Sequence, residues 1–327
     1  MAVTDQPVSR RDAVARLGML GGLAAGAAGV GLWLRGRSRK PVEPAAAIVS
    51  RDLRVPPDPA YPEVVVVSGG EPTDLVRAAI EALGGIRRFI APGDVVVLKP
   101  NVAWDRTPEQ AADTNPEVVA ETARLCFEAG AAEVIVTDVT CNEARRCFQR
   151  SGIGAAAEAA GARVVLPEDR LFRRADLQGS VLGRWPVLEP ILTADKIINI
   201  PVAKHHSLTR VTLGMKNWYG ILGGQRRRLH QRIHESITDL AAFLRPTLTL
   251  IDAYRVLLRG GPTGGNLENV AVEKTLFAGA DPVALDARVA KTYWDLEAAQ
   301  LAFVQIAARR GLGRADFEAV HTRVLNI

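Results

Sequence analysis

Short apolar runs recur along the chain from residue 63, and segments of helical character separate them. Four such strands and the three helices between them are expected at 63–67, 72–83, 94–98, 115–129, 133–137, 144–160 and 163–166. Strands that are apolar on both faces and joined by helices pair in parallel, with right-handed crossovers and helices on both faces of the sheet. The pattern therefore predicts an α/β fold with a mainly parallel sheet, in one large domain that is either undivided or built of two lobes.

After residue 168 the alternation is less regular. A small hairpin excursion is expected over 169–190. Further strands and helices are then expected at 196–200, 230–245, 247–251, 272–278, 282–293 and 296–309. These elements continue the alternation of strands and helices to near the end of the chain.

The first 47 residues have the pattern of an export leader. Ser9-Arg10-Arg11-Asp12 precedes an apolar run, rich in glycine and alanine, over residues 17–34. An arginine pair before a moderately apolar run is the address of the twin-arginine route, which exports folded proteins. The twin-arginine translocase is therefore an expected partner, and the expected location is the periplasm or the outer face of the cytoplasmic membrane. A plain membrane anchor is the alternative, in which residues 17–34 tether the protein.

The rest of the sequence divides into a linker and a domain. Prolines concentrated in residues 41–62 predict a Pro-rich linker over 48–62, and the α/β domain is expected over 63–327. Residues 1–47 carry seven basic and three acidic side chains, so they account for +4 of the formal net charge of +5. The near-neutral remainder gives no reason to expect nucleic acid as a partner.

Polar residues follow several of the expected strands. They are Lys99, Asn101, Asp138, Lys204, His205, His206, Lys216, Asn217 and Asp252. Loops after the carboxyl ends of parallel strands form the ligand crevice of an α/β sheet, so these side chains are expected to meet in one cleft. Lysines in such a cleft bind carboxylate or phosphate, and desolvation lowers a lysine pKa enough for proton transfer or Schiff-base formation. The alternative is that each lysine extends into solvent from its strand end.

Four of the five histidines fall between residues 205 and 234. His205 or His230 is expected to transfer a proton, because an imidazole titrates near neutral pH. His230 and His234 are four residues apart, and on one helix face that spacing suits a divalent metal. A solvated helix face beside Arg226–Arg228 is the alternative.

Weaker signals come from carboxylates and glycines. Asp138, Asp252 and Asp281 could provide oxygen ligands to a metal or set a histidine tautomer, although Asp281 also has the position of a helix cap. The backbone amides of Gly264 and Gly265 could bind an anion, although such a loop is more often a flexible turn or lid.

Taken together, these motifs resemble the family named domain of unknown function 362. The resemblance runs from about residue 63 to 310 and is carried by Lys99-Pro100-Asn101, Thr114-Asn115-Pro116, Lys196-Ile197-Ile198-Asn199-Ile200-Pro201, Lys204-His205-His206, Val211-Thr212, Lys216-Asn217-Trp218-Tyr219-Gly220, His230, Ile251-Asp252-Ala253, Gly261-Pro262, Gly264-Gly265 and Ala278-Gly279-Ala280-Asp281-Pro282-Val283-Ala284. It implies a fold and a shared site, but no reaction. Either His205 or His206 would fill the family's histidine position.

Many relatives in that family carry an additional module with two four-iron clusters. This chain departs from them, because Cys126, Cys141 and Cys147 include no Cys-x-x-Cys pair and the sequence holds no iron–sulfur motif. The cofactor is left open, with a divalent metal as one candidate.

Two functions are compatible with this pattern. An enzyme would hold a small anionic molecule with Lys99, Lys204 and Lys216, orient it with Asn101 and Asn217, and perform metal-assisted proton transfer or a redox-linked reaction. A non-catalytic periplasmic accessory protein would capture a ligand or metal in the same cleft and pass it to a membrane partner.

Overall fold

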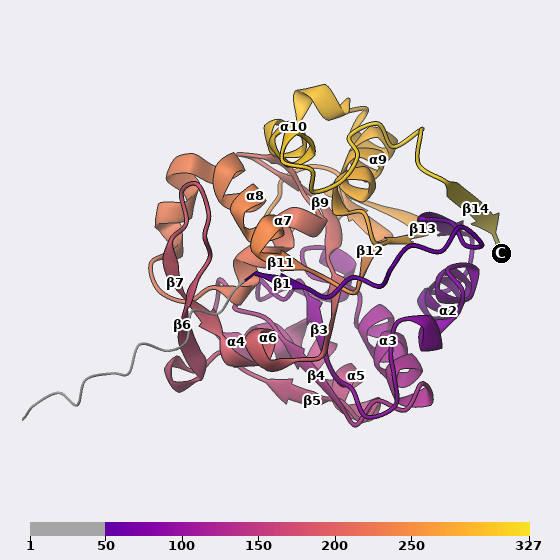
Figure 1. Cartoon of the computed structure of the whole chain (residues 1–327), viewed down its shortest axis with the longest axis horizontal. Coiled ribbons are helices and arrows are strands. Elements are labelled where there is room, and N and C mark those ends of the chain that lie inside the picture. The colour runs from indigo at the N-terminus through magenta and orange to yellow at the C-terminus, as the bar shows by residue number, and fades with distance from the viewer. Residues whose placement is uncertain (1–49) are drawn as a thin grey trace, which may run out of the picture. The chain divides into compact units, whose positions relative to one another are not determined.

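A mixed ten-stranded sheet runs through residues 50–327, the part of the chain that the computed structural model describes (Figure 1). Its strands are β2 (Val64–Ser68), β3 (Val95–Pro100), β4 (Glu133–Thr137), β5 (Arg163–Val165), β8 (Lys196–Ile200), β9 (Val202–His206), β10 (Arg210–Thr212), β12 (Leu248–Leu257), β13 (Val270–Gly279) and β14 (Thr322–Asn326). Along the path β14-β2-β13-β12-β8-β3-β4-β5, only the two pairings of β13 are antiparallel. The predicted α/β class with a mainly parallel sheet is confirmed.

Helices cover both faces of this sheet. They are α2 (Pro72–Ala82), α3 (Pro116–Glu128), α4 (Ala144–Arg150), α5 (Ile153–Ala159), α6 (Glu189–Thr193), α7 (Gly214–Asn217), α8 (Ile233–Phe243), α9 (Pro282–Trp294) and α10 (Ala302–Arg309). Successive strand side chains point to opposite faces. Val64 and Val66 of β2 therefore enter the core that contains α6 to α10, whereas Val65 and Val67 enter the core that contains α2 to α5. Two apolar layers thus enclose the sheet, and residues 50–327 belong to one compact unit.

Short 3-10 helices connect several of these elements. They are η1 (Ile86–Arg88), η2 (Pro108–Gln110), η3 (Asp169–Leu171), η4 (Trp218–Ile221), η5 (Arg226–Arg232), η6 (Leu267–Asn269) and η7 (Ala298–Gln300). The helix predicted over 230–245 is wrong at its start, because Arg232 adopts φ −133° and separates η5 from α8. The single helix predicted over 144–160 is also wrong, since Gly152 at φ 73° divides it into α4 and α5.

Two polar motifs predicted to follow strands lie inside strands instead. Residues 204–206 belong to β9, which begins directly after Pro201 and pairs in parallel with β12. Asp252 lies within β12, which continues to Leu257. The edge strand β14, which pairs in parallel with β2, was not among the predicted elements.

The hairpin predicted over 169–190 is present as β6 (Phe172–Asp176) paired antiparallel with β7 (Arg184–Leu188). The buried carboxylate of Asp239 in α8 fixes its tip by accepting hydrogen bonds from the backbone amides of residues 180–182. The base of the hairpin holds the loop at 222–224, because Trp185 Nε1 donates to Gly223 O and Gly223 N donates to the carbonyl of residue 186. The hairpin therefore supports a loop that forms part of the candidate site.

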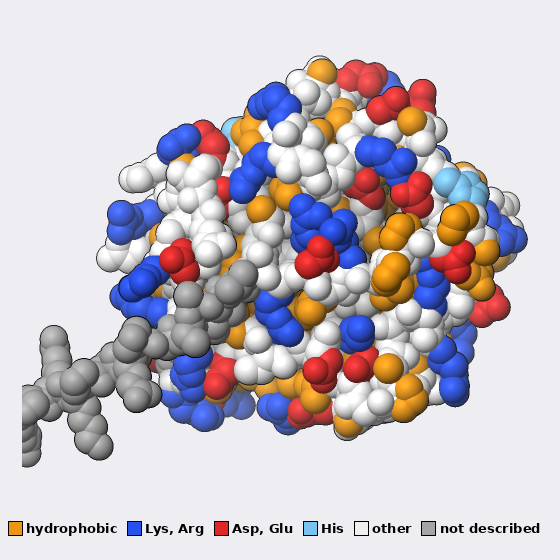
Figure 2. All heavy atoms as spheres, viewed as in Figure 1, with side chains coloured by type: hydrophobic (Ala, Val, Ile, Leu, Met, Phe, Trp, Pro, Cys, Tyr) orange, Lys and Arg blue, Asp and Glu red, His pale blue; other side chains and the backbone are white. Residues whose placement is uncertain are grey.

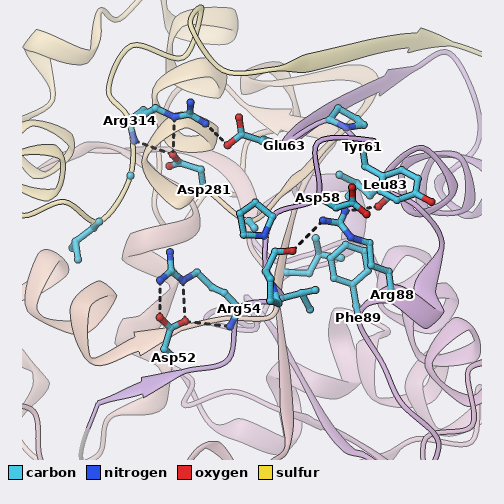
Figure 3. A pocket seen from close by; sticks show the side chains of 18 of the residues that line it. Asp52, Arg54, Asp58, Tyr61, Glu63, Leu83, Arg88, Phe89, Asp281 and Arg314 are labelled. Atoms are coloured by element: carbon cyan, nitrogen blue, oxygen red, sulfur yellow. Dashed lines mark hydrogen bonds and ion pairs between the residues drawn. The ribbon is translucent and has the colours of Figure 1, made fainter.

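The segment predicted as a Pro-rich linker lies against the domain over its described residues. β1 (Arg51–Asp52) pairs in parallel with β11 (Leu244–Arg245), and the Arg51 guanidinium donates to the carbonyls of Ile191 and Ala194. A hollow of about 460 Å³ lies beside this segment, and its charged side chains pair with one another, as Arg314 does with Glu63 and Asp281 (Figure 3).

The predictions for the leader, residues 1–47, lie outside the described residues. Within residues 50–327, no helix combines the length and apolar character that crossing a bilayer requires. Basic and acidic side chains are interspersed over the face shown in Figure 2, as expected from the near-neutral charge of the sequence beyond the leader.

Candidate functional site

A cavity of about 820 Å³ lies at the edge of the sheet where β3, β4 and β9 end. Seven of the residues singled out in the sequence line it: Asn101, Asp138, Lys204, His206, Lys216, Asn217 and His230. They come from segments up to 129 residues apart, and the strand ends and the turn formed by α7 and η4 bring them together. The cavity is hereafter called the lysine pocket.

Lys99 forms the floor beneath the lysine pocket and has no exposed surface. Its amine lies 2.7 Å from Asp138 Oδ1 and donates to the carbonyl of Pro100 and to Asn217 Oδ1, at 2.7 and 3.0 Å. Burial lowers the pKa of Lys99, and the carboxylate of Asp138 opposes that shift. Two hydrogen bonds and one ion pair commit the ammonium group, which indicates a structural role for Lys99 in place of the predicted catalytic one.

A network of amide side chains extends from this ion pair across the pocket floor. Asn217 Oδ1 also accepts from Asn101 Nδ2 at 3.0 Å, while Asn217 Nδ2 donates to Asn199 Oδ1 at 2.9 Å. Asn101 Oδ1 in turn accepts from Lys204 Nζ at 2.8 Å. The two asparagines predicted to orient a ligand therefore first orient the lysines, because their side-chain groups are committed to this network.

Gly220 allows this arrangement to close. A Cβ atom at residue 220 would lie 1.8 Å from Asp138 Oδ1 and 2.7 Å from Lys99 Nζ. The backbone of η4 can therefore pass over the ion pair only because residue 220 has no side chain.

Lys204 is also buried, and its amine donates to Asn101 Oδ1 and to the carbonyl of Ala112. Burial lowers the pKa of Lys204, and the nearby carboxylate of Asp113 opposes the shift. Burial raises the pKa of Asp113 in turn, and Lys204 opposes that change. The sequence pattern did not indicate a role for Asp113 in the site.

Lys216 differs from the other two lysines. Only 7% of the residue is exposed, yet within residues 50–327 its amine has no hydrogen-bond or ion-pair partner. The amine lies 4.5 Å from the ring centre of Tyr219, whose π face favours a cation. Burial, together with repulsion from Lys204, lowers the pKa of Lys216 to about 7.

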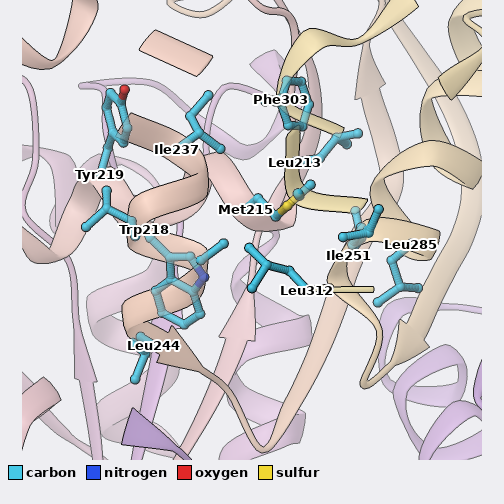
Figure 4. Close-up of a cluster of buried hydrophobic side chains, with 14 of the residues drawn as sticks. Leu213, Met215, Trp218, Tyr219, Ile237, Leu244, Ile251, Leu285, Phe303 and Leu312 are labelled. Atoms are coloured by element: carbon cyan, nitrogen blue, oxygen red, sulfur yellow. The ribbon is translucent and has the colours of Figure 1, made fainter. Parts of the chain in front are cut away.

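The backbone that carries Lys216 is rigid. The buried carboxylate of Asp286 in α9 accepts from Gly214 N at 2.7 Å and from Met215 N at 3.0 Å. Met215 and Trp218, on either side of Lys216, enter the apolar core (Figure 4). The polar and apolar anchors together fix the direction from which the Lys216 amine enters the pocket.

His206 and His230 provide the imidazoles of the lysine pocket. His206 Nδ1 accepts from the backbone amides of Leu208 and Thr209 at 3.1 and 3.4 Å, so in the neutral ring the proton is on Nε2. Burial and the positive charges of Lys216 and Lys204 lower the pKa of His206 to about 2. His206 is therefore a neutral hydrogen-bond donor toward the pocket.

His230 lies at the pocket mouth, in an edge-on contact with Tyr219 at a ring-centre distance of 5.8 Å. Burial and the charge of Lys216 lower its pKa, while backbone hydrogen bonds oppose the shift. A neutral His230 can accept a proton from a ligand.

Arginines line the mouth of the lysine pocket. Arg226 donates to the carbonyls of Val139 and Thr140 and so fixes the loop after β4. Arg227 and Arg228 are exposed, and neither forms an ion pair within the described part of the chain. The sequence suggested only a solvated helix face here, although three consecutive arginines beside His230 are a signal for an anion site.

Other predicted residues lie away from the lysine pocket. His205 is next to two pocket residues in β9, and the alternation of side chains along a strand turns it to the opposite face. Gly264 and Gly265 do not line the cavity, because hydrogen bonds from Arg106 and Gln110 hold their loop against residues 106–110. His206, rather than His205, is therefore the pocket histidine of this pair.

The predicted metal ligands do not come together. His234 stacks on Phe303, Asp252 accepts from the amides of residues 115 and 254, and Asp281 caps α9. Asp138 pairs with Lys99, and the break before α8 separates His234 from His230. Among residues 50–327 no three His, Cys, Asp or Glu side chains are grouped so that they could hold a metal ion.

The structural role of Lys99 leads to a stability prediction. Lys99→Met should lower the free energy of unfolding by about 3–5 kcal/mol, because the buried Asp138 carboxylate then has no counter-charge. The double variant Lys99→Met/Asp138→Asn should regain part of this loss, since an asparagine still accepts from Val102 N. Urea unfolding measures both, with the exposed Lys291→Met as control. Equal losses in the single and double variants would contradict the assigned role.

Comparisons with known proteins show the family of this chain and leave the reaction open. The thylakoid-associated protein sll1697 of Synechocystis sp. is 30% identical over 219 residues, which span 64% of this chain and 66% of that protein. The lactate racemase apoprotein from Thermoanaerobacterium thermosaccharolyticum matches 72% of this chain and 57% of its own, with 12% identity and a TM-score of 0.43, a likeness too low to bear on activity. The model of the domain of unknown function DUF362 matches residues 96–291, more than half of the sequence, and the chain belongs to that family.

Proposed function

We propose that this chain is an enzyme that binds a small organic anion in the lysine pocket and transfers a proton to or from it. The observation that carries the proposal is Lys216, a largely buried residue whose amine has no hydrogen-bond or ion-pair partner among residues 50–327 and which lines the pocket. An amine that borders a cavity without a protein partner is available to form a charge-assisted hydrogen bond with a ligand.

The charges around the pocket favour an anion. Lys204 and Lys216 line its wall, and Arg226, Arg227 and Arg228 line its mouth. The carboxylate of Asp138 is already paired with Lys99. Asp113 lies near Lys204, whereas Arg227 and Arg228 form no ion pair within residues 50–327. A ligand therefore meets unpaired positive charge at the pocket mouth, where the exposed guanidinium groups match carboxylate or phosphate oxygens in geometry.

The two imidazoles of the pocket favour a catalytic function over ligand binding alone. Neutral His206 can donate a hydrogen bond to a ligand oxygen through Nε2, and neutral His230 can accept a proton. An amine whose pKa is close to neutrality can act as either acid or base. An accessory protein that only binds an anion would gain more from lysines that stay fully charged.

Export by the twin-arginine route is the second part of the proposal. It rests on Arg10-Arg11 and the apolar run 17–34, with the translocase as partner and a periplasmic or membrane-associated location. The name of the Synechocystis relative associates that protein with a membrane system, which agrees with a protein that works at a membrane.

The anion site predicts selective losses of affinity. Lys216→Met should weaken the binding of oxalate on the order of tenfold to a hundredfold, because a charge-assisted hydrogen bond is removed, and Arg227→Ala should weaken it less. Isothermal titration calorimetry of the purified full chain measures both. Lys196→Met, at the start of β8 and outside the pocket, is the matched control. Unchanged oxalate affinity in Lys216→Met would contradict the proposed site.

The lowered pKa of Lys216 predicts how affinity depends on pH. Below about pH 7 the amine is protonated and attracts the anion, and above that pH it becomes neutral. Oxalate affinity should therefore fall as pH rises through 7, and the fall should be much smaller in Lys216→Met. The charge of oxalate is constant over this pH range, so a change in affinity reflects titration of groups on the protein. Affinity that rises with pH would contradict the assignment.

The export proposal predicts a change of location. Replacing Arg10 and Arg11 by lysine should keep the full chain in the cytoplasm of a bacterial host with a twin-arginine route, because the address is lost. Cell fractionation and immunoblotting measure this, with Arg35→Lys/Arg37→Lys as the matched control. Undiminished export of the Arg10/Arg11 variant would overturn the proposed route.

A further inference from the structure

We propose that Lys216 forms an imine with the carbonyl carbon of an anionic aldehyde or ketone, which names the ligand class of the lysine pocket and rests on the function proposed above. The inference depends on geometry that separates Lys216 from the two lysines beside it.

The amine of Lys216 is free to react, whereas the other two are committed. Lys99 has three partners for its three protons, and Lys204 has Asn101 and a backbone carbonyl. The amine of Lys216 contacts the face of Tyr219 and borders the cavity. A nucleophile must approach a carbonyl carbon without first breaking its own hydrogen bonds, and only Lys216 of the three meets that condition.

The surroundings keep part of the Lys216 population neutral. The titratable and charged groups that act on the amine come from several elements: Lys204, His206, Tyr219, Arg226, His230 and Cys141. Burial and the charges of Lys204 and Arg226 lower its pKa to about 7, while Cys141 opposes the shift, so part of the amine population carries a free electron pair at neutral pH. An ordinary lysine is almost entirely protonated there.

The pocket also provides the remaining groups that imine formation needs. The amine nitrogen attacks the carbonyl carbon, the C–N bond forms, and the carbonyl π electrons move to oxygen, which accepts a hydrogen bond from His206 Nε2. The nitrogen loses a proton to His230, which passes it to the alkoxide oxygen and gives a neutral carbinolamine. A second proton moves in the same way from nitrogen to the hydroxyl group, which leaves as water while the C=N bond forms. Carbonyl compound and amine thus give imine and water, and no oxidant or reductant takes part.

The charged groups at the mouth define the rest of the ligand. Arg227 and Arg228 are exposed at the pocket opening, while Lys216 lies deeper, on α7. A ligand that reaches both has a carboxylate or phosphate at one end and a carbonyl group at the other. The fixed position of α7, held by Asp286, keeps the amine aimed at the reacting carbon.

Reductive trapping tests the inference on the full chain. The protein is incubated with glyoxylate, and separately with glyceraldehyde 3-phosphate, in the presence of sodium cyanoborohydride, and the modified lysines are mapped by peptide mass spectrometry. We expect Lys216 to be modified at least about tenfold faster than Lys196, with a rate that rises as pH rises through 7 because the neutral amine reacts. Oxalate should slow this modification.

The outcomes separate this inference from the proposed function. If the protein binds oxalate but the modification is spread over exposed lysines without enrichment at Lys216, the imine proposal is wrong. The proposed anion site is not contradicted by that result. Absence of both oxalate binding and Lys216 modification overturns both. Mapping on the wild-type protein keeps the test decisive even where Lys216→Met fails to fold. Where that variant folds, loss of the single fast-reacting site in it supports the imine.

Discussion

The buried ion pair between Lys99 and Asp138 is the interaction on which the candidate site depends. It joins the ends of two neighbouring parallel strands, β3 and β4, and both of its side chains are buried. A buried charge is tolerated only when its counter-charge and hydrogen bonds are complete, so both side chains must keep this geometry. Asn217 connects the pair to η4 and α7, and through them to the pocket wall. Because Gly220 has no side chain, the backbone of η4 in the pocket wall can lie close to the ion pair.

The different surroundings of the three amines explain why three lysines at one sheet edge have different properties. The ammonium group of Lys99 pairs with Asp138 and donates hydrogen bonds to Pro100 O and Asn217 Oδ1. The ammonium group of Lys204 donates hydrogen bonds to Asn101 Oδ1 and to a backbone carbonyl group. Lys216 has no hydrogen-bond or ion-pair partner within residues 50–327 and lies near the positive charges of Lys204 and Arg226, so part of its population loses its proton at neutral pH. Burial and the like charges of Lys204 and Arg226 thus disfavour the ammonium form of Lys216.

Most of the fold could be predicted from the sequence, because apolar strands and helices alternate clearly up to residue 166 and buried strands of this kind pair in parallel. The convergence of Lys99, Asn101 and Asp138 followed from the same rule. The pairing partner and register of β9 could not be predicted, since they depend on contacts with β12, and His205 was therefore not distinguished from His206. Whether a lysine is structural or free depends on the distances from its amine to possible partners, and these distances cannot be derived from the spacing of residues along the sequence. Asp286 lies inside a helix and gave no signal of its contact with α7.

Direct titration of the Lys216 amine tests the central claim, that burial and the nearby charges of Lys204 and Arg226 leave this lysine partly neutral. Nitrogen-15 labelling of lysine side chains, with the Lys216 resonance assigned from its absence in Lys216→Met, allows the amine to be followed by NMR as pH changes. The structure predicts a midpoint near pH 7 in the unliganded protein. A midpoint near 10.5, the ordinary value for a lysine, would show that the amine is solvated and would contradict the account.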